Sequence, residues 1–246
     1  MRRYLNFIIL AFILIALSAL VYFVHYAIFH DVHHIFIYMV GDLAFLPLEV
    51  FLVVVVVERL LARREKQAIM QKLNMVVGAF FSEVGNELLQ SLLGCFEKSK
   101  DISRHLGIKQ SWTHTDFKKA MSFARAIEAE PSCQNVNLEE LKAFLIRKRQ
   151  FLLALLENPN LLEHERFTDL LWATFHFTEE LEARKSLMGL PETDIRHIAG
   201  DIQRVYRHLI VEWLCYVEHL KSNYPYLFSL VARMQPFQEH PSPVVA

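Results

Sequence analysis

The sequence predicts an all-α protein in which a two-helix transmembrane hairpin is followed by a cytoplasmic antiparallel helical bundle. Two long apolar runs within the first 57 residues predict the hairpin, and apolar residues at helical spacing in the remainder predict the bundle. The hydrophobic fraction of 53% is high for a soluble protein of 246 residues. Because this excess is concentrated near the N-terminus, we expect one membrane segment and one water-exposed domain.

The first apolar run covers residues 4–29 and is interrupted by only three polar residues. It exceeds the roughly 20 residues that a helix needs to cross about 30 Å of hydrocarbon. A secretory signal peptide is the alternative, since Arg2 and Arg3 precede the apolar core. The apolar stretch continues well beyond the usual length of a signal-peptide core, which favours a retained transmembrane helix.

The second run, residues 35–57, is also long enough to span a bilayer. The connector at residues 30–34 contains no Lys or Arg, whereas Arg2 and Arg3 precede the first span and a basic cluster at residues 59–66 follows the second. The positive-inside rule therefore predicts that both termini are cytoplasmic. For a bacterial chain this membrane would be the inner membrane, and the basic cluster would lie near lipid headgroups.

These features divide the chain into three predicted parts. They are a transmembrane hairpin at 1–58 (spans about 4–29 and 35–57), a cytoplasmic all-helical domain at 59–237 and a flexible tail at 238–246. Of the 26 Lys and Arg residues, only Arg2 and Arg3 precede residue 58. The same region holds only three of the 27 Asp and Glu residues, so the cytoplasmic part is close to neutral. This balance argues against nucleic acid as a partner.

The cytoplasmic part contains few residues that would break a helix. Asn137 is a favourable N-cap, with Glu140 three residues later. Short connectors between long helices favour an antiparallel arrangement. The predicted helices are a continuation of the second span to about residue 88, one starting after Thr113 or Thr115 and ending before Pro131, and further ones from Asn137 to about 157, at about 162–187, at about 193–222 and after Pro225.

Two sets of small side chains in this part carry structural expectations. Gly78, Ser82 and Gly85 recur on one side of their helix and predict a close helix–helix contact. The three cysteines are isolated and in a predicted reducing compartment, so we interpret them as thiols of the core rather than disulfides or a zinc site. These are Cys95, Cys133 and Cys215.

Asp42 and Glu49 lie inside the second apolar run, seven residues apart. That separation is close to two helical turns, so both project from one face, which Tyr38 shares. An ionised group at such depth costs a few kcal/mol on insertion scales and normally faces protein or water. The first span has no Lys or Arg to pair with them.

Three interpretations of these acids remain open. Association of several copies would gather them into rings that attract cations. Glu49 could instead relay protons, because burial favours its protonated form. Both could also be protonated or hydrogen-bonded packing residues, near a carbonyl that Pro47 leaves without its helical donor.

Histidines crowd the predicted far end of the hairpin. Imidazole binds transition metals and titrates near neutral pH, so a metal or pH-sensing site is one interpretation. An ordinary polar loop is the other main interpretation, and haem ligation is a third. The residues are His25, His30, His33 and His34.

A stripe of titratable residues also follows the helix predicted at 193–222. At 100° per residue it lies roughly 130° away from the apolar face of that helix, so we interpret it as a solvated face rather than a metal site. The stripe contains Asp194, His197, Asp201, His208, Glu212 and His219.

No Gly-rich phosphate loop, HExxH or GxSxG motif is present in the sequence. We therefore expect neither an enzyme nor a cofactor. The favoured function is a homo-oligomer in the lipid bilayer that conducts or translocates cations or protons past Asp42, Glu49 and Tyr38. The alternative is a membrane-anchored scaffold or sensor whose helical bundle binds a cytoplasmic protein partner.

Overall fold

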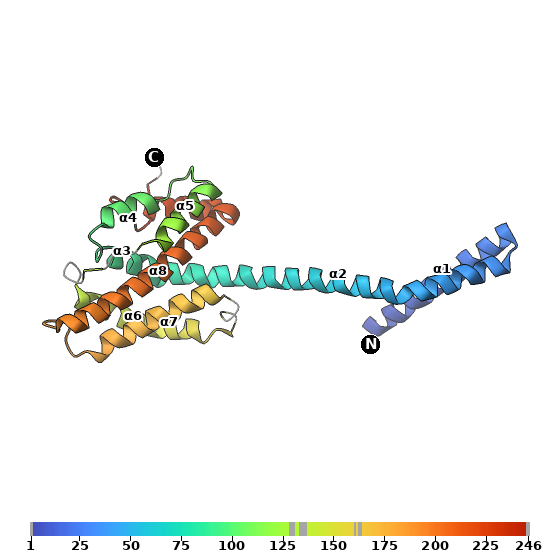
Figure 1. Cartoon of the computed structure of the whole chain (residues 1–246), viewed down its shortest axis with the longest axis horizontal. Helices are drawn as coiled ribbons and strands as arrows, with labels where there is room; N and C mark the ends of the chain where they lie inside the picture. Colours follow the sequence, from blue (N-terminus) through green and yellow to red (C-terminus); the bar gives the residue numbers. More distant parts are fainter. Residues whose placement is uncertain (1, 128–130, 133–136, 160, 162–163, 245–246) are drawn as a thin grey trace. The chain divides into compact units, whose positions relative to one another are not determined.

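The computed structural model describes residues 2–127, 131–132, 137–159, 161 and 164–244, with side chains described outside 2–7 and 66–72. Every regular element in this part of the chain is a helix, which confirms the predicted all-α class (Figure 1). The chain forms two compact units, Met1–Glu65 and Lys66–Ala246. The apolar run of the second span ends at Val57, so the first unit also includes charged residues that follow it.

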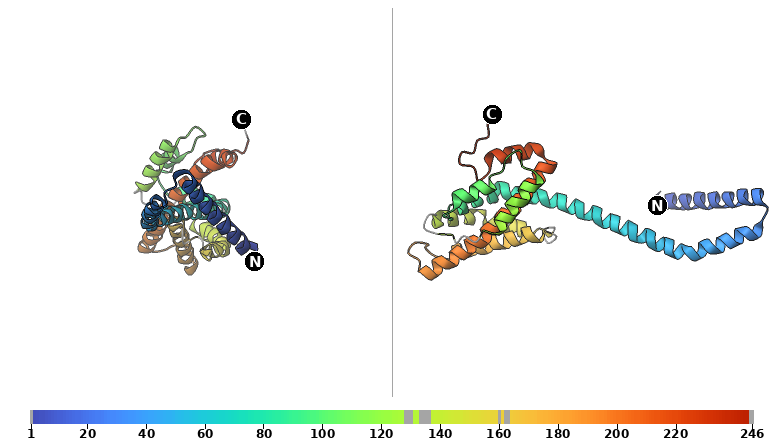
Figure 2. Two further views of the ribbon diagram at one scale, coloured as in Figure 1. Left: turned by 90° about the vertical axis from the view of Figure 1, so that its right-hand side faces the viewer. Right: turned by 45° about the horizontal axis from the view of Figure 1, so that its top comes forward.

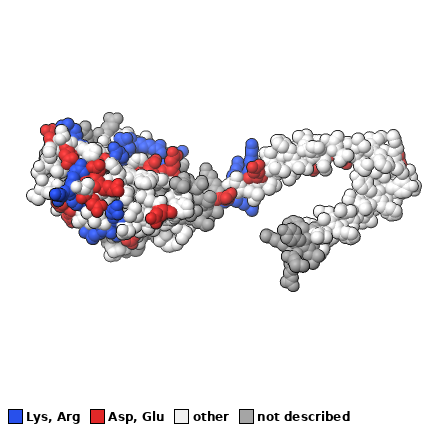
Figure 3. Space-filling view, turned by 90° about the horizontal axis from the view of Figure 1, so that it is seen from below, with Lys and Arg blue, Asp and Glu red and all other residues white. Residues whose placement is uncertain are grey.

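The first unit is the hairpin of α1 (Arg2–Phe29) and the first part of α2 (Val32–Phe80). Asp31 Oδ1 accepts the backbone N–H of His34 at 3.2 Å, which caps the start of α2, and His30 turns the chain with a φ of 51°. Ile8–Phe29 and Val32–Glu65 are long and apolar enough to cross a membrane. The uncharged surface of the hairpin is white in Figure 3. These helices are consistent with membrane association.

The second unit is built around one long helix, α8, which contacts α5, α7, α9, α3 and the turn before α3 (Figure 2). Its largest fully buried side chains include Trp213 and Tyr206 of α8 and Phe167 and Phe177 of α7. After α2 the elements are η1 (Phe81–Gly85), α3 (Asn86–Leu93), α4 (Ser99–Leu106), α5 (His114–Arg125), α6 (Leu138–Leu156), α7 (Glu165–Ala183), α8 (Glu192–Asn223) and α9 (Pro225–Met234).

Local capping explains where two of these helices begin. Thr113 and Asp116 form a capping box at α5, in which Asp116 Oδ2 accepts the Thr113 N–H at 2.7 Å. Asn137 Oδ1 accepts the N–H of Glu140 at 3.2 Å and starts α6, as predicted. Helix α4 was not predicted, because it is short and buries only two side chains.

The small residues near the end of α2 lie in different environments. Gly78 faces α8, where an added Cβ would lie 3.2 Å from the Tyr216 hydroxyl oxygen. Gly85 is the last residue of the π-helical turn η1 and lies against the rings of Phe80 and Phe81. A Cβ at this position would lie 2.4 Å from Phe81 Cδ1. Ser82 is exposed. Gly78 is therefore the member of this set that lets α8 approach closely.

The chain that follows α9 remains packed on the bundle for several residues. The Gln235 side chain accepts the Ile108 N–H at 2.6 Å and donates to the Ile108 carbonyl at 2.7 Å. Phe237 packs edge-on against Trp213, with ring centroids 5.1 Å apart. Of the predicted tail at 238–246, the last two residues lie outside the described part, as does Cys133.

Candidate functional sites

The second-span acids are exposed, as are almost all the described side chains of the hairpin. Asp42, Glu49 and Tyr38 are all exposed, and no hydrogen bond or ion pair joins either acid to another described residue. Helix α1 therefore does not cover the acids within one chain. A carboxylate on an apolar helix has to find water, a proton or another chain, because hydrocarbon cannot solvate its charge.

The far-end histidines are only partly brought together. The imidazoles of His25 on α1 and His34 on α2 stack with centroids 5.9 Å apart, and His34 meets Tyr38 edge-on at 4.6 Å. The Nε2 atom of His25 is buried and has no hydrogen-bond partner among the described residues. His30 and His33 are exposed. The hairpin thus pairs two histidines and does not assemble four of them as ligands.

The titratable stripe of α8 is only partly the solvated face that its sequence pattern indicates. Asp201 is 2% exposed and Glu212 is 3% exposed. For Asp201 and Glu212 the prediction was wrong, because α7 runs antiparallel along this side of α8 and covers them, whereas the His197 side chain stays 52% exposed. We call the result the polar seam: Asp194, His197, Asp201, His208 and Glu212 of α8 with Arg184, Glu180, His176, Asp169, Arg166 and His164 from α7 and its flanks.

One end of the polar seam gathers two histidines and two carboxylates. His197 Nε2 lies 3.5 Å from Glu180 Oε2 and 3.5 Å from Asp201 Oδ2. His176 Nε2 lies 4.0 Å from Glu180 Oε1 and 4.0 Å from Asp201 Oδ1. Ligand atoms of Glu180, His197 and Asp201 lie within 4.8 Å of one another. In the described part of the chain, no other group of at least three such residues is this close.

Arg184 forms charged hydrogen bonds at this end of the polar seam. Its guanidinium donates to both carboxylate oxygens of Asp194, at 2.9 and 2.7 Å, and to Glu180 Oε2 at 2.8 Å. These charged hydrogen bonds lower the pKa of Asp194 and of Glu180 below their ordinary values. Both carboxylates are therefore ionised at neutral pH and available as acceptors or ligands.

The other end of the polar seam contains a buried acid with an imidazole partner. His164 Nδ1 accepts the Phe167 N–H at 3.2 Å as the N-cap of α7, so its Nε2 carries the proton and faces Glu212 Oε1 at 3.3 Å. Burial raises the pKa of Glu212, and the charges of His164 and Arg166 oppose that rise. Arg166 also donates to Cys215 Sγ at 3.3 Å, while burial raises the pKa of that thiol.

Glu212 should make stability depend on pH, and Glu212→Gln should remove that dependence. Because its pKa is raised in the folded state, the folded protein holds a proton that the unfolded chain releases near pH 4.5. Stability contributed at this site therefore falls as pH rises from about 4.5 through the folded pKa. Unfolding measured from pH 4.5 to 7.5 should show Glu212→Gln gaining stability relative to wild type as pH rises. The control Glu165→Gln, at an exposed position, should follow wild type; parallel wild-type and Glu212→Gln curves would contradict the assignment.

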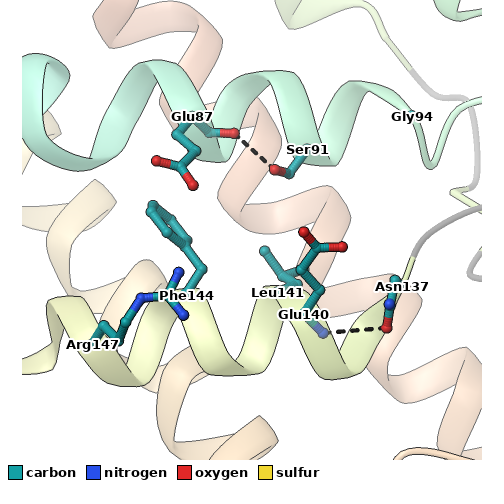
Figure 4. Close-up of a pocket in the computed structure, with 8 residues that line it drawn as sticks. All are labelled: Glu87, Ser91, Gly94, Asn137, Glu140, Leu141, Phe144 and Arg147. Carbon is teal, nitrogen blue, oxygen red and sulfur yellow. Dashed lines mark hydrogen bonds between the residues drawn. The ribbon is translucent and has the colours of Figure 1, made fainter.

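A separate pocket of about 290 Å³ lies between α3 and α6. In Figure 4 the Phe144 ring of α6 rises toward Glu87 of α3, with Arg147 beside it. Glu140 also lines the pocket, and its backbone N–H donates to the Asn137 side chain that caps α6. None of the buried polar atoms that lack a hydrogen-bond partner belongs to the residues that line this pocket.

His176 and Glu180 were missed in the sequence, although a signal for them exists. His176 precedes Glu180 by four residues, and His197 precedes Asp201 by four, so each pair lies on one face of its helix. Two such pairs on consecutive helices joined by a short turn can meet if the helices pack antiparallel. Only the register of α7 against α8 decides whether they do.

Comparison with known proteins identifies relatives along almost the whole chain. The family described as MJ1433, N-terminal helical domain, matches residues 3–61, and the one described as uncharacterized protein MJ1433, C-terminal helical domain, matches residues 69–233. The uncharacterized protein MJ1433 of Methanocaldococcus jannaschii is 45% identical over 236 residues, covering 96% of this chain and 94% of that protein. No solved structure matches. The chain therefore belongs to the MJ1433 family.

Proposed function

We propose that this protein is a two-pass membrane protein whose copies associate so that the second span lines a path for cations or protons. The observation that carries the proposal is the exposure of Asp42 and Glu49 on an apolar helix, without a partner in their own hairpin. Tyr38 extends the same face toward the turn. Association would place the acids of several copies around a shared axis, in water rather than lipid.

The energetic argument favours association over a solitary hairpin. Each acid would cost about 2.5–3.5 kcal/mol at the centre of a lipid-facing helix on insertion scales. Protonation or contact with water in an assembly relieves most of that cost. Negative or protonatable groups along a path favour cations and protons over anions.

The distribution of basic residues supports a topology with both termini, and the second unit, on the cytoplasmic side. Arg2 and Arg3 precede α1, and the cluster that follows Val57 contains Arg59, Arg63 and Arg64. In a bacterial cell this would be the inner membrane. The second unit would then assemble or gate the path from the cytoplasm.

Flux through liposomes tests the proposal. Purified protein should carry K⁺ or H⁺ down an imposed gradient. Glu49→Gln or Asp42→Asn should change that flux at least about tenfold, because each substitution removes a carboxylate that attracts the passing cation or holds the proton. Glu58→Gln is the matched control, since Glu58 lies on the same helix beyond the apolar run. It should retain the wild-type flux.

The mass of the protein in detergent gives a second readout. We expect an oligomer, since one hairpin cannot surround a path. If wild type carries no ion under any gradient, or is strictly monomeric in detergent and in bilayers, the path does not exist.

A membrane-anchored scaffold is the second candidate function, and one specific observation favours it. Helix α9 presents an apolar stripe at helical spacing whose side chains are 40–72% exposed, formed by Tyr226, Leu227, Leu230 and Met234. Such a stripe could bind an amphipathic helix of a cytoplasmic protein. Absence of flux together with a stable complex that Leu230→Lys disrupts would favour the scaffold over the path.

A further inference from the structure

We propose that the end of the polar seam formed by Glu180, His197 and Asp201, with His176 as a fourth ligand, binds one divalent transition-metal ion between α7 and α8. This inference concerns the second unit alone and does not depend on transport through the first. No comparison with a known protein assigns a metal to these residues.

The spacing of the donor atoms is close to that of a metal site. A tetrahedral ion with ligands at about 2.0–2.1 Å separates neighbouring donors by about 3.4 Å. The Nε2 atom of His197 lies 3.5 Å from an oxygen of Glu180 and 3.5 Å from an oxygen of Asp201. His176 Nε2 lies 4.0 Å from each carboxylate, so a small rotamer adjustment would bring it into the same shell.

Asp201 supplies an independent indication that a ligand belongs here. This carboxylate is 2% exposed, and its Oδ2 atom is buried without any hydrogen-bond partner among the described residues. Its other oxygen, Oδ1, accepts Arg204 Nη1 at 2.7 Å, so the side chain is fixed in orientation. Buried carboxylate oxygens are almost always paired or bound to a metal. Oδ2 points toward His197, where the ion would lie.

The charges around the site also favour a cation. The carboxylates of Glu180, Asp194 and Asp201 face the guanidiniums of Arg184 and Arg204, which leaves one net negative charge when both imidazoles are neutral. Arg184 donates to both oxygens of Asp194 and also to Glu180 Oε2, the oxygen that faces His197, so an ion would share that oxygen with the guanidinium. A divalent ion would convert the net charge to one positive and supply the partner that Asp201 Oδ2 lacks.

The donor set indicates which ions fit. Imidazole nitrogens combined with carboxylate oxygens suit Zn²⁺, Fe²⁺ or Mn²⁺, whereas Ca²⁺ and Mg²⁺ prefer sites made of oxygen atoms alone. The half-exposed position of His197 leaves a route by which an ion can enter from water. A bound ion would link α7 to α8 near the turn that joins them.

Zinc binding by the full-length protein in detergent tests this proposal. After removal of metal by a chelator, titration with ZnCl₂ in a calorimeter should show one tight equivalent. His197→Gln and Asp201→Asn should each weaken that equivalent at least about tenfold, the scale seen even for outer-shell partners of metal sites. His208→Gln, on the same helix outside the cluster, should bind as wild type does.

The hairpin histidines require their own control. The double variant His33→Gln/His34→Gln should still bind one Zn²⁺ ion tightly. Loss of tight Zn²⁺ binding in this variant would show that the ion binds at the hairpin and would overturn the proposal. Equal affinity in wild type and His197→Gln would also overturn it. His197 is half-exposed, so this substitution should leave the fold intact even if Asp201→Asn does not. A wild-type protein that binds no Zn²⁺, Co²⁺ or Mn²⁺ would likewise exclude the site.

Discussion

Trp213→Ala is expected to lower the free energy of unfolding of the second unit by about 3–5 kcal/mol, the usual cost of removing a buried indole. Trp213 is 0% exposed on α8. Its Nε1–H donates to Asn86 Oδ1 at 3.1 Å, and its ring packs edge-on against Phe237. The substitution would leave a cavity between α8, α3 and the chain after α9, together with an amide oxygen deprived of its donor.

Chemical denaturation followed by circular dichroism in detergent measures this effect, because apolar membrane helices usually stay helical while the second unit unfolds. Trp172→Ala is the matched control: Trp172 is 58% exposed on α7, and its truncation should change stability by about 0.5 kcal/mol or less. Equal losses in the two variants would show that Trp213 does not occupy the core position described.

His164→Ala is expected to destabilise the second unit by about 2–4 kcal/mol, because one side chain performs two tasks. Its Nδ1 caps α7 through the Phe167 N–H, and its Nε2 faces the buried carboxylate of Glu212. Removing the imidazole leaves an open helix end and a buried acid that keeps only the more distant Arg166.

Two further variants separate these tasks. His164→Asn should restore the cap and recover about 1 kcal/mol, since Asn is a favourable N-cap. The double variant His164→Ala/Glu212→Gln should recover a different part of the loss, because the uncompensated charge is gone. If the two single substitutions are instead strictly additive in the double variant, His164 and Glu212 do not interact.

The hairpin and several helix starts could be predicted from the sequence, because their causes are local. Long apolar runs define α1 and the first part of α2, and the side chain of Asn137 caps α6 through a group three residues away. Helical periodicity predicted α8 within one residue at each end, and Pro225 marked the start of α9. Each of these signals lies within one helix and needs no knowledge of its neighbours.

The polar seam could not be predicted in the same way. A hydrophobic stripe shows which side of α8 is apolar, but α8 is packed by several helices and its buried arc is wider than that stripe. Asp201 and Glu212 are buried by α7, a separate helix whose register against α8 is not encoded in either helix alone. For Asp42 and Glu49, sequence and structure agree, since neither acid has a hydrogen-bonding or ionic partner among the described residues of the hairpin.

The polar seam has a consequence for how α7 finds its alignment on α8. Arg184 pairs with Asp194, Glu180 with His197, and Asp169 lies near His208. Moving toward the N-terminus of α7 therefore corresponds to moving toward the C-terminus of α8. A slip of one helical turn, about 5.4 Å, would separate Arg184 from Asp194 and Glu180 from His197. Apolar surfaces tolerate such a slip, whereas ion pairs between the two helices lose their Coulombic attraction when the charges separate. The charges therefore favour the observed alignment of α7 on α8 over one shifted by a helical turn.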